Sequence, residues 1–156
     1  MIIGIGTDTG GDDAAGLLAA RRLRELGVEA LDYSGEVLGL IELWEGARSV
    51  ILIDAMRSGR PPGAIAVLDA RQAPLAREDF AVSTHGLGLA EAIALAAALG
   101  RLPERVVIYG IEGRNFSPGD VVSPEVLAAV EEAARRIFDA WSNDRAAPLE
   151  GTSVPP

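Results

Sequence analysis

Two adjacent acids follow a glycine-rich turn close to the start of the chain. The stretch GIGTDTGGDD, at residues 4–13, ends in Asp12 and Asp13. A glycine-rich turn after a first strand often places backbone N–H groups around a phosphate at the start of a helix. Two carboxylates at that position would fill the anion site themselves and repel a phosphate. One aspartate is enough to cap a helix, so we expect the other carboxylate to face a cation.

Two more residues could complete such a cation site. Asp54 ends the clearest apolar segment, SVILID at residues 49–54, and His85 is the only histidine in the chain. Each has an ordinary structural explanation when taken alone, because an aspartate often starts a turn and a lone histidine often begins a helix or lies at the surface. Brought together, two carboxylates and an imidazole would suit a divalent transition ion such as nickel or zinc, with positions open for water or substrate. Gly86, next to His85, would let another backbone approach closely.

The glycine-rich turn also fits a dinucleotide site, which we keep as an alternative. Gly4, Gly6 and Gly10 form a G-x-G-x-x-x-G pattern, and Asp32 follows a second predicted strand, which is the outline of such a site. The signal is weak, because short glycine patterns are common and the acid pair opposes a pyrophosphate. Binding of a dinucleotide in a calorimetric assay would favour this alternative.

Alternating strand and helix patterns predict how these residues are positioned. Strands are predicted at residues 2–5, 28–31, 49–54, 64–69 and 105–111, and helices at 13–26, 36–46, 86–99 and 123–141. This order predicts an α/β fold, a three-layer sandwich with a twisted, mostly parallel five-stranded sheet and helices on both faces. The connection between the third and fourth strands is too short for a crossover helix, so we expect that pair to be antiparallel. Ligands of such sheets bind outside the carboxyl ends of the strands, where the acids are expected.

Composition narrows the class of protein. At 156 residues, with 49% hydrophobic and 24% charged residues, the chain fits one domain at residues 1–142, followed by a flexible, Pro- and Gly-rich tail at 143–156.

The absence of cysteine excludes thiol catalysis and thiolate metal sites and fits a cytoplasmic protein. A formal charge of −9 opposes a nucleic-acid partner. No apolar segment is long enough to cross a bilayer and no basic stretch precedes one, so we expect neither a membrane span nor a signal peptide.

Several short motifs together resemble one known family. They are Gly4-Ile5-Gly6-Thr7, Asp12-Asp13, Asp54-Ala55, Ser83-Thr84-His85-Gly86-Leu87-Gly88-Leu89, Gly110-Ile111-Glu112 and Ser123-Pro124-Glu125-Val126. In this order they resemble the hydrogenase maturation protease family, which processes the large subunit of nickel–iron hydrogenases. Three positions depart from the family pattern: Thr7 replaces an asparagine, Ala14 a common glycine, and Gly113 a usual proline.

The resemblance implies an endopeptidase that removes the C-terminal extension of a hydrogenase large-subunit precursor after nickel insertion. Asp13, Asp54 and His85 match the family positions that meet this nickel, so the substrate would present the metal. The division of the acid pair, with Asp13 toward the cation and Asp12 as the helix cap, also follows from the family. The supporting turn residues are Gly4, Gly6, Asp12 and Gly86. We expect the protein to act as a monomer on the precursor.

The mechanism that this implies is metal-assisted hydrolysis. The ion would polarise the scissile carbonyl or activate a water, with Asp13 or Asp54 as the general base of an aspartic-type endopeptidase. Ser83 lies too close to His85 in sequence to form a convincing triad, and no His-Glu-x-x-His zinc motif is present. A non-proteolytic nickel-recognition or chaperone module, which binds the metal through the same residues and cleaves nothing, stays open as an alternative.

Overall fold

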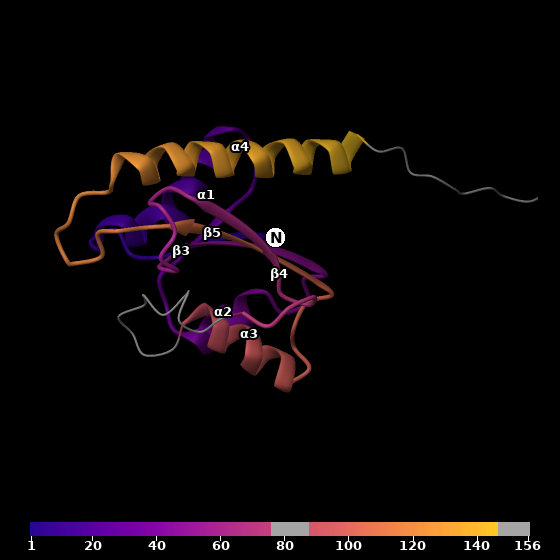
Figure 1. Cartoon of the computed structure of the whole chain (residues 1–156). Helices are drawn as coiled ribbons and strands as arrows, with labels where there is room; N and C mark the ends of the chain where they lie inside the picture. Colours follow the sequence, from indigo (N-terminus) through magenta and orange to yellow (C-terminus); the bar gives the residue numbers. More distant parts are fainter. Residues whose placement is uncertain (76–87, 147–156) are drawn as a thin grey trace, which may run out of the picture.

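A five-stranded sheet forms the centre of the protein. The computed structural model describes residues 1–75 and 88–146. The strands are β1 (Ile2–Ile5), β2 (Leu31–Tyr33), β3 (Ser49–Met56), β4 (Ile65–Asp69) and β5 (Arg105–Glu112), in the order β2-β1-β3-β5-β4 (Figure 1). Among these strands only β4 runs antiparallel to its neighbour. The central strands are rich in β-branched apolar residues because both of their faces are covered.

Helices cover both faces of the sheet. A short 3-10 turn, η1 (Gly11–Ala14), leads into α1 (Ala15–Glu25), which packs with α4 (Pro124–Ala146) on one face. The other face carries α2 (Val37–Leu43) and α3 (Leu89–Ala98) (Figure 1). Ile53 of β3 packs with α1 and α4, whereas Leu52 and Met56 pack with α2 and α3. The predicted three-layer α/β sandwich is therefore confirmed.

The second strand begins later than the prediction at residues 28–31. It spans Leu31–Tyr33, because the residues before it remain tied to α1. The Val28 N–H donates to the Leu23 carbonyl at 2.9 Å, and the Arg24 guanidinium donates to the Ala30 carbonyl at 2.9 Å. These contacts make a close helix-to-strand turn that strand-forming residue types alone do not reveal.

The fourth strand has the predicted direction but a different neighbour. β4 runs antiparallel, and it pairs with β5 rather than with β3, since β5 lies between them. The connection at residues 57–64 has to reach past one intervening strand, a distance of about 10 Å. A chain of that length spans this distance easily, so a short connection does not require adjacent strands.

The last helix is longer than predicted. α4 runs to Ala146, whereas the sequence pattern ends the helix near residue 141 and the domain at residue 142. Its buried side packs in one core with α1 through residues such as Ala133 and Ile137. Residues 147–156, most of the predicted tail, lie outside the described part of the chain. Within the described ranges, no helix is both long and apolar enough to cross a bilayer.

Gly16 marks the closest approach of α1 to the sheet. A Cβ atom at this position would lie 2.2 Å from the carbonyl oxygens of both Ile5 and Ile53. Helix propensity alone would make Gly16→Ala stabilising by up to about 1 kcal/mol, but the backbones of two strands cannot yield. We therefore expect Gly16→Ala to lower the free energy of unfolding by about 2–3 kcal/mol in urea denaturation. A variant as stable as the wild type would contradict this packing.

Candidate active site

The glycine-rich turn after β1 is packed against the protein's own backbone. A Cβ atom on Gly4 would lie 2.0 Å from the Gly16 carbonyl oxygen, and one on Gly6 would lie 1.9 Å from the Asp13 carbonyl oxygen. Gly6 also has a φ of +149°, which favours glycine. These glycines therefore bring β1 and the start of α1 together, and they leave no room for a phosphate at these two positions.

Asp12 is fully buried and holds the loop between β5 and α4. Its carboxylate accepts hydrogen bonds from the N–H groups of Arg114, Asn115 and Ser123 at 2.7, 2.9 and 2.6 Å, and from the Ser123 hydroxyl at 2.8 Å. Burial alone would raise the pKa of Asp12, but together these hydrogen bonds lower it below its ordinary value. The predicted helix cap is wrong, because neither η1 nor α1 has a side-chain capping hydrogen bond.

Asp13 and Asp54 form an electrostatically coupled pair at the carboxyl edge of the sheet. Asp13 is partly buried in η1, and the Thr7 hydroxyl donates to its Oδ2 at 2.8 Å. Asp54, near the end of β3, is only 8% exposed. Burial, and then the negative charge of Asp13, raise the pKa of Asp54 well above its ordinary value, against a hydrogen bond from the Ala55 N–H. The charged form of Asp54 is therefore disfavoured.

The third predicted ligand, His85, and its neighbour Gly86 lie outside the described residues. Asp54 alternates along β3 with Leu52 and Met56, so its side chain lies on the face that α2 and α3 cover. α3, which follows His85 in the chain, lies on this same face. In the ranges 1–75 and 88–146, no three acids or histidines form a cluster that could hold a metal. The convergence of all three predicted ligands stays a prediction.

Glu112 is a second buried acid with a structural role that the sequence patterns do not reveal. It ends β5, is 2% exposed, and lies beside Met56 in the strand register. Its carboxylate accepts from the N–H groups of Ser58 and Gly59 at 3.0 Å and from the Ser58 hydroxyl at 2.8 Å. Glu112 thus holds the turn between β3 and β4. The sequence singles out Glu112 through its position at the end of an apolar strand and through the Gly110-Ile111-Glu112 motif, but neither reveals this role.

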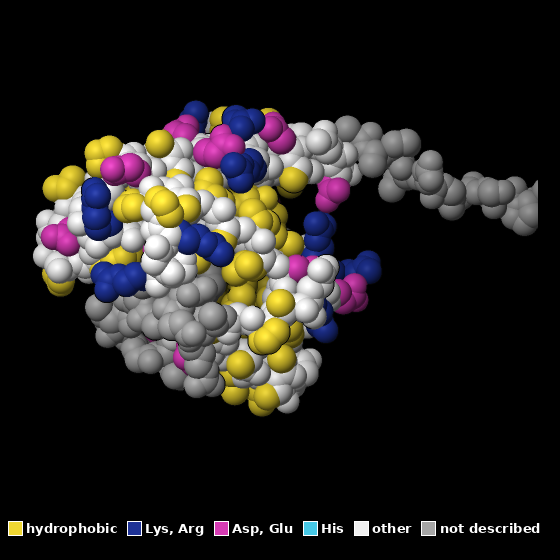
Figure 2. Space-filling view, in the orientation of Figure 1, with side chains coloured by type: hydrophobic (Ala, Val, Ile, Leu, Met, Phe, Trp, Pro, Cys, Tyr) yellow, Lys and Arg dark blue, Asp and Glu magenta, His cyan; other side chains and the backbone are white. Residues whose placement is uncertain are grey.

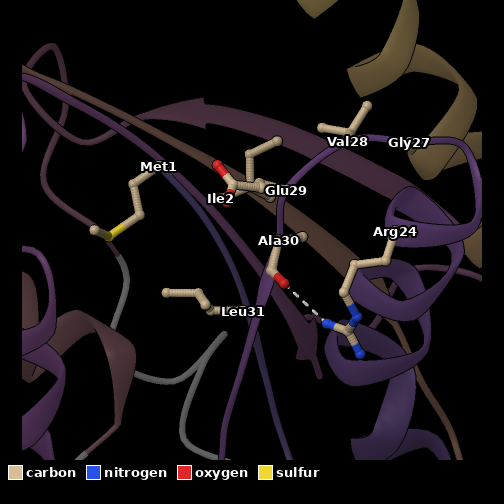
Figure 3. Close-up of a pocket in the computed structure, with 8 residues that line it drawn as sticks. All are labelled: Met1, Ile2, Arg24, Gly27, Val28, Glu29, Ala30 and Leu31. Atoms are coloured by element: carbon tan, nitrogen blue, oxygen red, sulfur yellow. Dashed lines mark hydrogen bonds between the residues drawn. The ribbon is translucent and has the colours of Figure 1, made fainter.

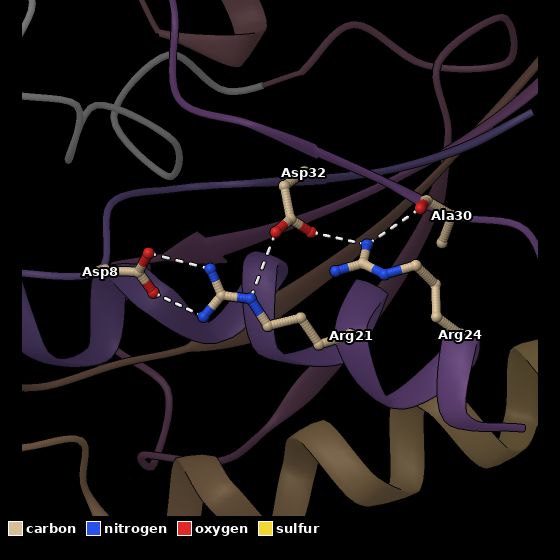
Figure 4. Close-up of polar contacts among 5 residues, drawn as sticks. All are labelled: Asp8, Arg21, Arg24, Ala30 and Asp32. Atoms are coloured by element: carbon tan, nitrogen blue, oxygen red, sulfur yellow. Dashed lines mark hydrogen bonds and ion pairs between the residues drawn. The ribbon is translucent and has the colours of Figure 1, made fainter.

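Asp32, the acid of the dinucleotide alternative, is held by two arginines of α1 (Figure 4). Arg24 and Arg21 donate to its two carboxylate oxygens at 2.8 and 3.2 Å, and Arg21 also binds Asp8 through two hydrogen bonds. The hydrogen bond from Arg24 is the main cause of a lowered pKa of Asp32. Because Asp32 is engaged by these arginines and Gly4 and Gly6 are packed on backbone, the geometry opposes dinucleotide binding.

A hollow of about 670 Å³ lies at the opposite edge of the sheet, where β1 and β2 begin (Figure 3). Its walls are mostly apolar and include Ile2, Val28 and Leu31. Ligands of open α/β sheets bind at the carboxyl ends of the strands. We therefore place the candidate active site at Asp13 and Asp54 and assign no chemistry to this hollow.

Comparison with known proteins agrees with the fold. The family described as "HycI: Hydrogenase maturation protease" matches residues 17–140. The chain belongs to the hydrogenase maturation protease family. The predicted resemblance and the prediction that the protein is a peptidase are thereby confirmed.

Individual relatives cover nearly the whole chain. The protein is 26% identical over 165 residues to the hydrogenase expression/formation protein HupD of Rhizobium leguminosarum bv. viciae, covering 100% of this chain and 82% of HupD. It is 25% identical to the hydrogenase 2 maturation protease of Escherichia coli (strain K12), covering 90% of this chain and 88% of the relative.

Solved structures share the fold. The hydrogenase maturating endopeptidase HybD from E. coli superposes with a TM-score of 0.76 at 23% identity, covering 92% of this chain and 91% of HybD. The maturation protease HycI from Thermococcus kodakarensis KOD1 superposes with a TM-score of 0.64 at 29% identity, covering 88% of each chain.

Proposed function

We propose that this protein is the endopeptidase that removes the C-terminal extension of a nickel–iron hydrogenase large-subunit precursor after nickel insertion. In this proposal Asp13, Asp54 and His85 recognise the nickel that the precursor presents. The metal is then part of the substrate and not a resident cofactor. The predicted cytoplasmic location and monomeric state belong to the same proposal.

One observation carries the proposal: a buried carboxylate, Asp54, lies beside a second carboxylate, Asp13, at the edge of the sheet where ligands bind. Burial and a like charge both disfavour ionised Asp54, and attraction to an approaching cation would offset both effects. The oxygen donors suit a divalent ion, and the absence of cysteine and the single histidine argue against tight binding of a private ion. The donor set therefore fits a metal that arrives with a partner.

The two carboxylates supply the chemistry that this chain contributes. A nickel ion bound there would polarise the scissile carbonyl. Asp54, buried beside Asp13, would be the general base that takes a proton from the attacking water. Asp13, oriented by the Thr7 hydroxyl, would face the ion. A cysteine nucleophile is excluded by composition.

A non-proteolytic nickel-recognition module stays the second candidate function, because it would bind nickel through the same carboxylates. The test uses the purified protein with the large-subunit precursor encoded in the same organism, loaded with nickel. Mass spectrometry should detect a shortened large subunit and a released C-terminal peptide. A stable complex with an intact precursor would instead support the binding module, and a calorimetric response to a dinucleotide would favour the nucleotide alternative.

Thr7 offers a matched pair of variants in the same assay. Its hydroxyl donates to Asp13 at 2.8 Å, so Thr7→Val removes the donor while keeping the shape of the side chain. We expect Thr7→Val to lower kcat/KM about tenfold, the effect of losing one hydrogen bond to a charged group. Thr7→Ser keeps the hydroxyl and should retain most of the activity. If the two variants lose activity equally, Thr7 does not orient Asp13.

A further inference from the structure

Arg57 and Arg60 are exposed cations without an acidic partner in the described part of the chain. Acids outnumber arginines and lysines 23 to 14. Most arginines elsewhere in the described ranges pair with an acid, as Arg48 does with Glu104 and Arg101 with Glu45, whereas Arg105, at the start of β5, is exposed and forms no ion pair with a described acid. Neither Arg57 nor Arg60 forms an ion pair with a described carboxylate, although both are exposed. The protein has a net charge of −9. Two unpaired positive charges on one turn therefore indicate a site that binds an anionic group of another molecule.

The turn that carries these arginines is held firmly. The buried Glu112 carboxylate binds the backbone of Ser58 and Gly59, which lie between Arg57 and Arg60. The turn also packs against α4, since a Cβ atom on Gly63 would lie 2.6 Å from the Glu125 carbonyl oxygen. A fixed turn presents its two guanidinium groups with less loss of entropy on binding than a flexible loop would.

Arg57 comes directly after β3, three residues beyond Asp54 of the candidate active site. Its guanidinium stacks over the Phe116 ring, 4.6 Å from the ring centroid. That ring in turn lies against Gly113, where an added Cβ would be 2.5 Å from Phe116 and 2.8 Å from the Asp12 Cβ. One aromatic ring and one glycine therefore separate Arg57 from Asp12, the sequence neighbour of Asp13. Figure 2 shows arginine side chains, in dark blue, on the side where the β3–β4 turn and the loop after β5 lie in Figure 1.

We propose that Arg57 and Arg60 bind a carboxylate of the peptide that is to be cleaved, downstream of the scissile bond. This inference rests on the proposed function. Guanidinium groups bind carboxylates bidentately, so the two arginines would hold the C-terminal extension while the acids meet the metal-bearing part of the precursor. The carboxylate is either the C-terminal α-carboxylate or an acidic side chain of the extension, because both share the same chemistry.

The test compares single variants in cleavage of the nickel-loaded precursor. Arg57→Gln and Arg60→Gln should each raise KM about five- to tenfold, with kcat nearly unchanged, because they weaken binding equally in the ground and transition states. Arg105→Gln is the matched control: it removes the same charge from another exposed arginine, at the start of β5 and so at the opposite edge of the sheet. An unchanged KM in both turn variants, or an equal increase in Arg105→Gln, would overturn the proposal.

Two altered precursors separate the sources of the carboxylate. A neutral Gly-Ser tail added after the last residue moves the α-carboxylate away, and replacement of acidic residues in the extension by their amides removes the side-chain charges. The effect of Arg57→Gln should disappear with one of these substrates. If it persists in full with both, the arginines do not bind a carboxylate of the extension.

A binding measurement separates this inference from the proposed protease function. A fluorescent peptide with the sequence of the extension is titrated with the protein, and its anisotropy is followed without nickel and without cleavage. Binding weakened by Arg57→Gln and Arg60→Gln, but not by Arg105→Gln, supports the arginine site even if no precursor is cleaved. If the turn variants cleave the precursor with an unchanged KM and bind the peptide as tightly as the wild type, the proposed protease function is retained and the proposed arginine site is wrong.

Discussion

Asp12→Asn is expected to lower the free energy of unfolding by about 3–5 kcal/mol, because it disrupts a buried site with four hydrogen-bond donors. An asparagine can accept through one oxygen only, and its amide would point a donor at the N–H of Arg114, Asn115 or Ser123. The loop between β5 and α4 would then lose the side-chain part of its attachment to η1, and only backbone hydrogen bonds such as that from the Asp12 N–H to the Asn115 carbonyl would remain. Urea denaturation measures the loss.

Asp120→Asn is the matched control for this variant. Asp120 is exposed and accepts a single hydrogen bond, from the Ser117 N–H, so the change should stay within about 0.5 kcal/mol. The pH dependence gives a second check. The pKa of Asp12 is lowered in the fold, so its stabilising effect is present above the unfolded value of about 3.9 and is lost as the pH falls through the folded value. Equal stability of Asp12→Asn and the wild type at pH 7 would refute the anchoring role.

Asp54→Asn should have opposite effects on activity and on stability. We expect cleavage of the precursor to fall at least about 100-fold, because the variant removes a metal-facing charge and the general base. The melting temperature at pH 7 should rise by about 3 °C or more, because a neutral amide avoids the burial of a charge beside Asp13.

The pH dependence of this stabilisation follows from the direction of the pKa shift. The pKa of Asp54 is raised in the fold, so the stability associated with its protonated form is complete below the unfolded pKa and is lost as the pH rises through the folded pKa. The advantage of Asp54→Asn should therefore be small near pH 4 and grow toward pH 8 in thermal unfolding. A wild type that is more stable than the variant at pH 7 would contradict the buried, uncompensated charge.

The sequence predicts the layers of the fold well because they depend on local patterns. Apolar runs such as residues 49–54 form strands, and the alternation of strands and helices leads to a parallel sheet with two helical faces. The neighbour of β4 could not be predicted in the same way. It depends on β5, which enters the sheet after a long connection through α3, so the pairing is not a local property.

The sequence predicts which residues form the candidate site better than it predicts what each residue does there. Asp54 lies near the end of β3, and Asp13 lies in η1, which follows β1; both are at the edge of the sheet where ligands of such folds bind. The role of Asp12 depends on a loop more than one hundred positions later, since Asn115 and Ser123 donate to it. Likewise, the attachment of Ser58 to Glu112 is a contact between distant segments. No spacing in the sequence specifies either contact.

The most direct test of metal recognition by Asp13 and Asp54 is one comparison of cleavage. Wild type and Asp54→Asn are each incubated with nickel-loaded and nickel-free precursor, and the released C-terminal peptide is quantified by mass spectrometry. We expect rapid cleavage only for wild type with the nickel-loaded precursor, because only that combination pairs both carboxylates with a cation. Equal cleavage in all four combinations, or none with the nickel-loaded precursor, would contradict it.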